Sequence, residues 1–435
     1  MAIIAPRVLK GFRDFLPGQE ALRRVLTARF EAVFRAYGFA PIDTPALELA
    51  EILLGKGGGE TEKQIYRFTD NGGRDVALRF DLTVPFARFV ALHRDELPMP
   101  FKRYHIAKVW RGENTQHGRY REFTQCDFDS IGISSAAADA EILLMMRAAL
   151  AAAGAGQTTI LVNHRGLFNR LLMRCGVSGK LAEILRAVDK IEKIGRDEVK
   201  QTLISLAGEA AAAAILQFIE LDGPWDSVLA AMTEAAGGPE NDSERLAAIA
   251  QFLRDAGADG SFRLAPSITR GLDYYTGIVF ETVLDDLPSI GSICSGGRYD
   301  NLTGLYSKET LSGVGASIGL DRLIAALESL GRLPACNPFA ECTIICVNET
   351  HFGLYEQLAS HFRAEGINCE VFCETKKLTA QFIQAEKRGA RFAVIPDAEN
   401  PLEKPFTLRS LLERTDTEVS LPQAIKLITC ALSGV

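Results

Sequence analysis

The chain reads Phe101-Lys-Arg-Tyr-His-Ile-Ala-Lys-Val-Trp-Arg-Gly-Glu113 at the start of the segment that decides its fold. Residues 101–132 alternate as two long strands around a polar loop, Gly-Glu-Asn-Thr-Gln-His-Gly-Arg-Tyr. Between residues 98 and 125, six Lys or Arg stand against two Glu, a local excess of +4. Guanidinium groups on a rigid hairpin suit a polyphosphate, because they bind phosphate bidentately and stay charged. We expect Arg111, Arg119 and Arg121 to face one cleft, with a solvated basic strand edge as the alternative.

The elements around this hairpin predict an α+β protein. Residues 64–81 alternate as a second hairpin that turns at Asn71-Gly72-Gly73. Helices are expected at 15–38, at 83–94, and from the capping residues Ser134 and Ser135 to Gly154.

Residues 165–255 are rich in Ala, Leu, Glu and Lys at helical spacing, which predicts a helical insertion between two strand-rich blocks. Strand signals resume after it, and a helix is expected at 321–331. Beyond a Pro-containing linker at 334–338, strands and helices alternate as in a small α/β domain. We therefore expect residues 1–334 to form one domain, interrupted by the insertion, and residues 335–435 to form another.

Length and composition indicate a multidomain intracellular protein. The chain has 435 residues, and because single hydrophobic cores stop growing at roughly 250–300 residues, we expect more than one domain. Its net charge is −7. An acidic balance argues against indiscriminate binding to nucleic acid or anionic membrane. The start of the chain lacks the pattern of a secretory signal. The longest uncharged apolar runs are too short to span a membrane. We expect a cytoplasmic location.

The nine cysteines suit a reducing compartment better than a disulfide scaffold. Cys342 with Cys346, and Cys369 with Cys373, suggest a zinc site, but both pairs lie in apolar, β-branched runs. Positions i and i+4 share a face of a strand, so we interpret all four as buried core thiols and expect no structural metal.

Familiar nucleotide and nucleophile motifs are absent from the sequence. It contains no G-x-x-x-x-G-K-[ST], and Gly313-Val-Gly-Ala-Ser-Ile-Gly319 departs from the spacing of a dinucleotide-binding loop. Five other segments do recur in a recognisable order: Arg79-Phe-Asp-Leu-Thr-Val-Pro85, Gln125-Cys-Asp-Phe-Asp129, Arg270-Gly-Leu-Asp-Tyr-Tyr-Thr-Gly277, Cys294-Ser-Gly-Gly-Arg-Tyr-Asp-Asn301 and Gly319-Leu-Asp-Arg322. Together they resemble the class II aminoacyl-tRNA synthetases, and specifically the histidyl-tRNA synthetase family, over essentially the whole chain.

The resemblance implies a class II antiparallel sheet flanked by helices, followed by an anticodon-binding α/β domain. It also implies ATP-dependent activation of L-histidine, with Mg²⁺ accompanying the nucleotide, and transfer of the histidyl group to the 3′ end of histidine tRNA. Arg111 matches the arginine at the α-phosphate, Arg322 the one near the γ-phosphate, and Glu113 belongs to the adenine-binding loop. Arg270 matches an arginine placed against the α-phosphate and the substrate carboxylate.

Histidine selection is assigned by the same resemblance. Asp81, Thr83 and Gln125 match positions that bind the α-ammonium group, while Asp129 and Tyr275 match positions around the imidazole ring. Tyr274 lines the same pocket. Rejection of other amino acids would follow from buried polar groups left unpaired when no imidazole fills the site.

The resemblance also implies a homodimer and contact with tRNA. A cluster of basic residues in the C-terminal domain is our candidate for that contact, with a solvated helix face as the alternative: Lys376, Lys377, Lys387 and Arg388. A different function within the same fold is a regulatory subunit of ATP phosphoribosyltransferase that senses histidine. Such proteins typically lack the anticodon domain and parts of the ATP-binding set, whereas this chain has Arg111, Arg270 and Arg322 and about 100 residues after the expected catalytic core. The same arginines disfavour an RNA-binding or kinase-attached pseudo-synthetase.

Overall fold

The computed structural model of the chain describes residues 3–55, 60–268 and 274–433. The residues divide into two compact units, Met1–Asp14 with Val25–Pro334, and Phe15–Arg24 with Ala335–Val435. Among the helices in these described ranges, none is both long and apolar enough to cross a membrane.

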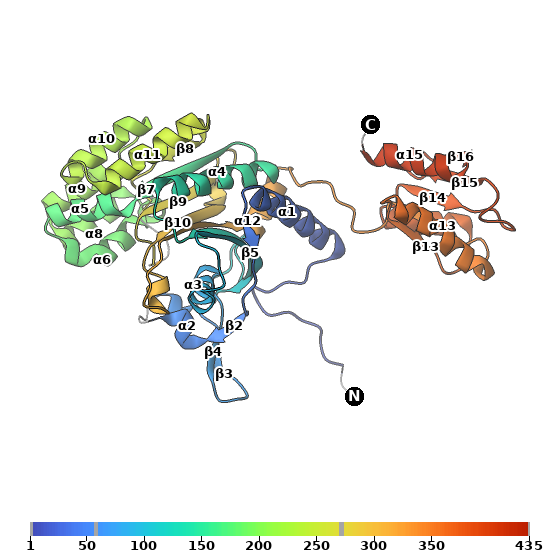
Figure 1. Ribbon diagram of the computed structural model, residues 1–435, viewed down its shortest axis with the longest axis horizontal. Coiled ribbons are helices and arrows are strands. Elements are labelled where there is room, and N and C mark those ends of the chain that lie inside the picture. Colours follow the sequence, from blue (N-terminus) through green and yellow to red (C-terminus); the bar gives the residue numbers. More distant parts are fainter. Residues whose placement is uncertain (1–2, 56–59, 269–273, 434–435) are drawn as a thin grey trace. The chain divides into compact units, whose positions relative to one another are not determined.

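A large mixed sheet forms the centre of the first unit (Figure 1). In spatial order its strands are β1 (Ala40–Pro41), β5 (Phe101–Trp110), β6 (Glu122–Ile131), β11 (Gly313–Gly319), β10 (Cys294–Tyr299), β9 (Ile278–Leu284), β7 (Thr158–His164) and β8 (Phe262–Leu264). The central neighbours are antiparallel, as predicted, whereas β1–β5 and β7–β8 at the two edges are parallel. The edges differ because each of these pairs is joined by a long crossover through other elements, which is how parallel strands connect.

Three helices cover one face of this sheet: α1 (Pro17–Ala36), α4 (Ala136–Ala152) and α12 (Leu320–Ser329). Phe34 of α1 packs on Phe128 of β6, with ring centroids 4.9 Å apart. The predicted cap of α4 is present, since the Ser135 hydroxyl accepts a hydrogen bond from the backbone N–H of Ala138.

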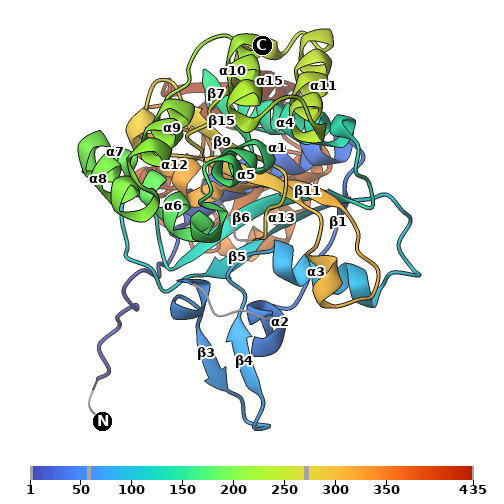
Figure 2. The ribbon, with the colours of Figure 1, turned by 90° about the vertical axis from the view of Figure 1, so that its left-hand side faces the viewer.

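The opposite face carries α3 (Thr83–Leu92), with α2 (Ala50–Leu54) and a small sheet of β2 (Leu47–Leu49), β4 (Asp75–Leu78) and β3 (Arg67–Thr69). Figure 2 shows β3 and β4 projecting from the body of the unit. Asp70 closes the predicted turn between them, because its Oδ1 accepts hydrogen bonds from the backbone N–H groups of Gly72 and Arg74, both at 2.9 Å.

The described elements between residues 165 and 255 are helices and turns, as the composition predicts (Figure 1). The α-helices are α5 (Arg165–Arg174), α6 (Leu181–Val188), α7 (Ile191–Ile194), α8 (Arg196–Ala207), α9 (Glu209–Ile219), α10 (Trp225–Ala236) and α11 (Asn241–Asp255). Arg245 of α11 and Arg298 of β10 both pair with the fully buried Asp139 of α4, at 2.5 and 2.6 Å. This shared carboxylate joins the insertion to the sheet.

The second unit contains the sheet β13-β12-β14-β15-β16. Its elements from Ala335 on are β12 (Cys342–Ile344), α13 (Phe352–Ala364), β13 (Cys369–Val371), α14 (Leu378–Lys387), β14 (Phe392–Ile395), β15 (Phe406–Ser410), β16 (Thr415–Val419) and α15 (Leu421–Ser433). The strand–helix alternation up to β14 is the one that the sequence predicts.

The four cysteines that we interpreted as core thiols do not all lie in the core of this unit. Cys342, Cys346 and Cys369 are buried in the hydrophobic core, as predicted. Cys373 is exposed, so the prediction is wrong there. The physical reason is that β13 ends at Val371, so the alternation that would carry position 373 to the inner face does not continue.

Candidate active site

A pocket of about 310 Å³ lies on the face of the central sheet that α1 leaves open. Side chains alternate along β6: Phe128 points to α1, whereas Gln125, Asp127 and Asp129 line the pocket. Residues from β10, β11 and the start of α12 line its other side. The antiparallel strands at the centre of the fold therefore build the floor of the site.

Buried carboxylates gather at one end of this pocket. Asp81 accepts hydrogen bonds from the backbone N–H of Val84 and from the Tyr274 hydroxyl, both at 3.1 Å. Asp129 accepts one from the Tyr299 hydroxyl at 2.7 Å. Burial raises the pKa of both carboxyl groups above its ordinary value, since removal from water penalises the charged form.

Arg103 of β5 partly balances the negative charge of these two carboxylates. Its side chain is fully buried, and its Nη2 lies 2.6 Å from Asp129 Oδ2. The guanidinium also lies 4.4 Å from the ring centre of Phe86 on α3. Its positive charge lowers the pKa of Asp129 and of Asp81, opposing the effect of burial. Sequence reasoning missed this role.

Gly315 of β11 gives the Asp129 carboxylate its space. A Cβ at this position would lie 1.9 Å from Asp129 Oδ1, which no side chain can tolerate without a shift. Gly315 and Asp129 are cross-strand partners, so the glycine is required by the close approach of a side chain rather than by a turn.

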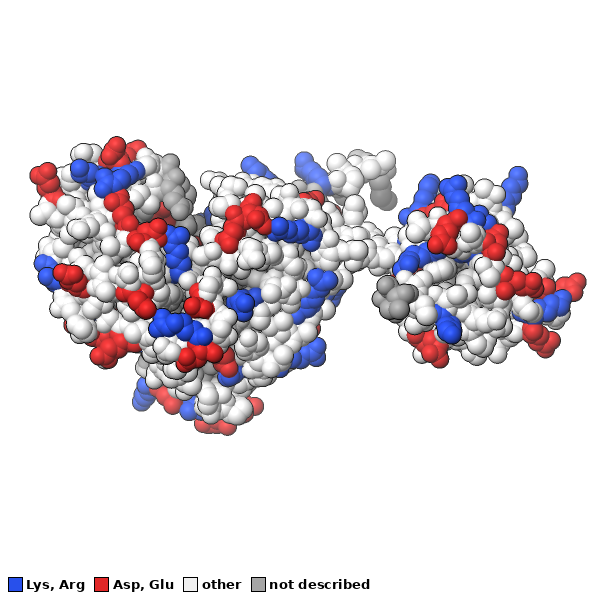
Figure 3. Space-filling view, turned by 90° about the horizontal axis from the view of Figure 1, so that it is seen from above, with Lys and Arg blue, Asp and Glu red and all other residues white. Residues whose placement is uncertain are grey.

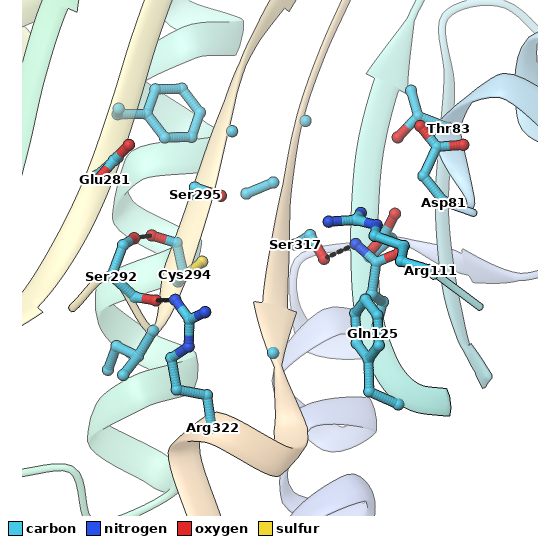
Figure 4. A pocket seen from close by; sticks show the side chains of 18 of the residues that line it. Asp81, Thr83, Arg111, Gln125, Glu281, Ser292, Cys294, Ser295, Ser317 and Arg322 are labelled. Atoms are coloured by element: carbon cyan, nitrogen blue, oxygen red, sulfur yellow. Dashed lines mark hydrogen bonds between the residues drawn. The ribbon is translucent and has the colours of Figure 1, made fainter. Parts of the chain in front are cut away.

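Arginines line the rest of the pocket, beginning with Arg111, whose charge acts on Asp81. Arg111 donates from Nε to the backbone carbonyl of Phe80 at 2.8 Å, and Arg322 donates from Nη1 to that of Ser292 at 2.6 Å. Figure 4 shows Arg322 at the end of β11, where α12 begins, and Arg111 beside Gln125. Arg119 pairs with Glu113 at 3.1 Å. Each guanidinium is thus oriented by one fixed contact.

These cations influence one another. Burial lowers the pKa of Arg322, and the nearby charges of Arg119 and Arg111 lower it further. Bringing guanidinium groups together is unfavourable unless an anion joins them, and planar guanidinium groups match phosphate oxygens bidentately. The arrangement is therefore suited to a polyphosphate ligand.

The structure brings most of the predicted site residues to this one pocket. Those that line it are Asp81, Thr83, Arg111, Glu113, Arg119, Gln125, Asp129, Tyr274, Tyr275 and Arg322. Arg121 is not in the described lining: its Nε donates to the backbone carbonyl of Glu113 at 3.2 Å, so it supports the loop. Arg270 lies outside the described residues.

Sequence reasoning missed Asp127, Glu281 and Ser317, which also line the pocket. Asp127 could have been found, because it lies between Gln125 and Asp129 on the same face of one strand. Ser317 could not, since nothing in the sequence places β11 beside β6.

The predicted basic cluster lies in the second unit, around α14. Lys377 immediately precedes this helix and Lys387 lies in its last turn. Lys376 pairs with Glu374 at 2.7 Å, and Arg388 pairs with Glu370. One face of the second unit also shows Lys and Arg interspersed with Asp and Glu (Figure 3). Lys376 and Arg388 therefore carry less uncompensated charge than the sequence suggests.

Comparison with known proteins identifies the family. The family model described as Histidyl-tRNA synthetase matches residues 11–323, and the one described as Anticodon binding domain matches residues 341–431. The chain belongs to the histidyl-tRNA synthetase family. It is 51% identical over 440 aligned positions to a histidine–tRNA ligase of Treponema denticola, and the alignment covers 98% of each chain.

Solved structures show the same relationship. The histidyl-tRNA synthetase from a Nostoc species matches with a TM-score of 0.88 and 32% identity, over 99% of this chain and all of that one. A Bacillus halodurans protein, described as an ATP phosphoribosyltransferase regulatory subunit/histidyl-tRNA synthetase, matches with a TM-score of 0.74. At 23% identity, over 88% of this chain and 97% of that one, this second match shows a shared fold alone.

Proposed function

We propose that the chain is a histidine–tRNA ligase, which joins L-histidine to ATP and then passes the histidyl group to the 3′ end of histidine tRNA. One observation carries the proposal: a single pocket holds both buried carboxylates and convergent arginines. An amino acid offers a cation and a carboxylate, and ATP offers a polyphosphate, so the two substrates meet with their reacting groups between these two sets of charges. The family relationship supports the same assignment.

In the first step a carboxylate oxygen of histidine attacks the α-phosphorus of ATP. The bond from that phosphorus to the bridging oxygen breaks, and pyrophosphate leaves with the electron pair. Arg111, held by the Phe80 carbonyl, neutralises charge on the α-phosphate, and Arg322 binds near the γ-phosphate. Arg119 and Glu113 bind the nucleotide from the loop between β5 and β6. We assign Arg270 to the α-phosphate and the substrate carboxylate.

The carboxylate end of the pocket selects histidine. Asp81, Thr83 and Gln125 bind the α-ammonium group, while Asp129 and Tyr275 bind the ring nitrogens and Tyr274 closes the pocket beside them. The Arg103 and Tyr299 contacts hold Asp129 in one orientation, so the recognising oxygen is already in place when the substrate arrives. No protein nucleophile is needed, because the substrate carboxylate is itself the attacking group.

ATP enters as its magnesium complex. Mg²⁺ prefers one or two carboxylates together with phosphate oxygens and water. Within the described residues no group of three or more His, Cys, Asp or Glu side chains is placed to hold a metal by itself. Glu281 lines the pocket and is a carboxylate of the type that would hold Mg²⁺ together with phosphate oxygens and water. Bound there, the cation would offset charge on the phosphates.

For the tRNA step we propose that residues 335–435 bind the anticodon region and that Lys376, Lys377, Lys387 and Arg388 contribute to it. Lys377 and Lys387 should contribute most, because the other two cations have carboxylate partners. We further propose that the protein is a homodimer, as the family resemblance implies, and acts in the cytoplasm. Two-fold dimers are the commonest symmetric assemblies of soluble proteins.

Histidine-dependent exchange of pyrophosphate into ATP, followed by charging of histidine tRNA, tests the proposal. We expect both activities, and expect Arg322→Ala and Arg270→Ala to lose most of the exchange. Arg254→Ala, on the outer surface of α11, is the matched control and should retain it. Absence of exchange in the unmodified enzyme would refute the ligase and favour a histidine-sensing regulatory subunit. Exchange without charging would refute the anticodon-domain assignment.

A further inference from the structure

Asp127 lines the pocket but has no role in the proposed function. Asp127 lies midway along β6, between Gln125 and Asp129, and is 2% exposed. Asp81 and Asp129 receive hydrogen bonds from tyrosine hydroxyls, but Asp127 Oδ1 has no hydrogen-bond partner among the described residues. An unpartnered buried acceptor costs free energy, so such a group is retained where a ligand completes it.

Ser317 connects Asp127 to Gln125. Ser317 and Asp127 are cross-strand partners on β11 and β6. Gln125 donates from Nε2 to Ser317 Oγ at 2.8 Å, as Figure 4 shows. Because the Ser317 hydroxyl has only one proton and accepts from Gln125, that proton is available to Asp127. A hydrogen bond from Ser317 is among the influences that lower the pKa of the Asp127 carboxyl.

These two hydrogen bonds fix the orientation of the Gln125 amide and of the Asp127 carboxylate. The amide nitrogen of Gln125 must face Ser317, which leaves Gln125 Oε1 as the free atom, and Oε1 indeed has no partner within the described part of the chain. Gln125 Oε1 and Asp127 Oδ1 are therefore two unpartnered acceptors. They project from alternate positions of one strand into the same pocket.

The charges around Asp127 indicate what completes the pair. Arg103 and Arg79 are nearby cations, while Asp129 and Asp81 are nearby anions. Cys294 of β10 also lies near the group. Burial is the main influence that raises the pKa of Asp127 to about 7; Asp129 and Asp81 also raise it, and Arg103 lowers it. A ligand that places a permanent cation between the acceptors would stabilise the ionised carboxylate. The α-ammonium of an amino acid is such a group, whereas a neutral imidazole ring is not.

We propose that Asp127 Oδ1 and Gln125 Oε1 together accept hydrogen bonds from the α-ammonium group of the amino-acid substrate, with Ser317 as the residue that positions both. This inference rests on the proposed function and adds Asp127 and Ser317 to its specificity set. The pair would reject ligands that have the imidazole ring but lack a cationic amine.

Binding of three ligands to Asp127→Asn distinguishes this role from a structural one. L-Histidine and L-histidinol carry the ammonium group, whereas 3-(imidazol-4-yl)propionate lacks it. Loss of a charge-assisted hydrogen bond should weaken the two amines by about 10- to 100-fold. The propionate should change by less than about twofold, and Ser317→Ala should reproduce the same selectivity with a smaller loss. Calorimetric titration measures all three.

Controls separate misfolding and failure of the proposed function. Ser130→Ala changes a buried residue of the same strand outside the described pocket lining and should leave every ligand unaffected. Unchanged ATP binding by the Asp127→Asn protein shows that the pocket is intact; if it is lost, Asp127→Ser is measured in its place. An equal penalty for the propionate, or none for the amines, would overturn the inference even if pyrophosphate exchange is normal. If Asp127→Asn weakens binding of the two amines alone, but the unmodified enzyme shows no pyrophosphate exchange, the proposed function would be overturned and the inference would stand.

Discussion

Replacing Arg103 with Met should destabilise the first unit strongly, because it leaves a buried carboxylate without its cation. Arg103 has no exposed surface, and its partner Asp129 is 2% exposed, with 2.6 Å between Nη2 and Oδ2. Methionine keeps most of the side-chain volume and the contact with Phe86, so the change removes charge more than packing.

The expected magnitude follows from the burial of both groups. Removing one partner of a buried ion pair costs about 3–5 kcal/mol. The first unit comprises about 320 residues, and an unfolding entropy of about 2.1 cal/mol/K per residue converts that loss to about 4–7 °C in melting temperature.

The loss should also depend on pH. Burial raises the pKa of Asp129 and Arg103 lowers it, so the variant raises this pKa further. The carboxyl is then protonated in the folded variant at a higher pH, and protonation removes the unpaired charge. The difference in stability between the variant and the unmodified protein should therefore be largest near pH 8 and shrink as the pH falls toward 5.

Differential scanning calorimetry at several pH values measures this difference. Arg196→Met, which removes an exposed ion pair with Glu220, is the control and should shift melting by less than about 1 °C. In Arg103→Met/Asp129→Asn the unpaired charge is gone, so part of the stability should return. A loss below 1 °C for Arg103→Met, or an equal loss at pH 5 and pH 8, would refute the electrostatic reasoning.

Three further predictions follow from particular contacts. Gly315→Ala should raise the KM for histidine in pyrophosphate exchange at least tenfold, because the added Cβ would collide with Asp129 Oδ1. Gly260→Ala is the control, since a Cβ there meets open space, and it should leave the KM unchanged. Ser135→Ala should lower the free energy of unfolding by about 0.5–1 kcal/mol through loss of the α4 cap, with Ser134→Ala as the control; a loss as large for Ser134→Ala would contradict the capping argument. Arg245→Leu should remove the contact of the insertion with Asp139 and speed proteolytic cleavage within the insertion. An unchanged cleavage rate would mean that this carboxylate does not hold the insertion in place.

Local elements were predictable where the relevant signal is short in sequence. The hairpin at 101–132, the turn after Asp70 and the cap at Ser135 each depend on neighbouring residues, and each occurs as expected. The face of β6 that carries Gln125 and Asp129 follows from the two-residue period of a strand. Cys373 shows the limit of that reasoning, because the period holds only as far as the strand does.

By itself, the sequence determined the order of the elements, the acidic balance with its local basic segments, and the motifs that place the chain in its family. The tertiary structure alone decided which of these residues meet. Tyr274 reaches Asp81 across 193 positions, Tyr299 reaches Asp129 across 170, and Gln125 reaches Ser317 across 192. Periodicity tells which face of a strand a side chain occupies but not which strand lies beside it. Sheet order is set by burial of the whole core, and so the roles of Arg103 and Ser317 became visible only in the folded protein.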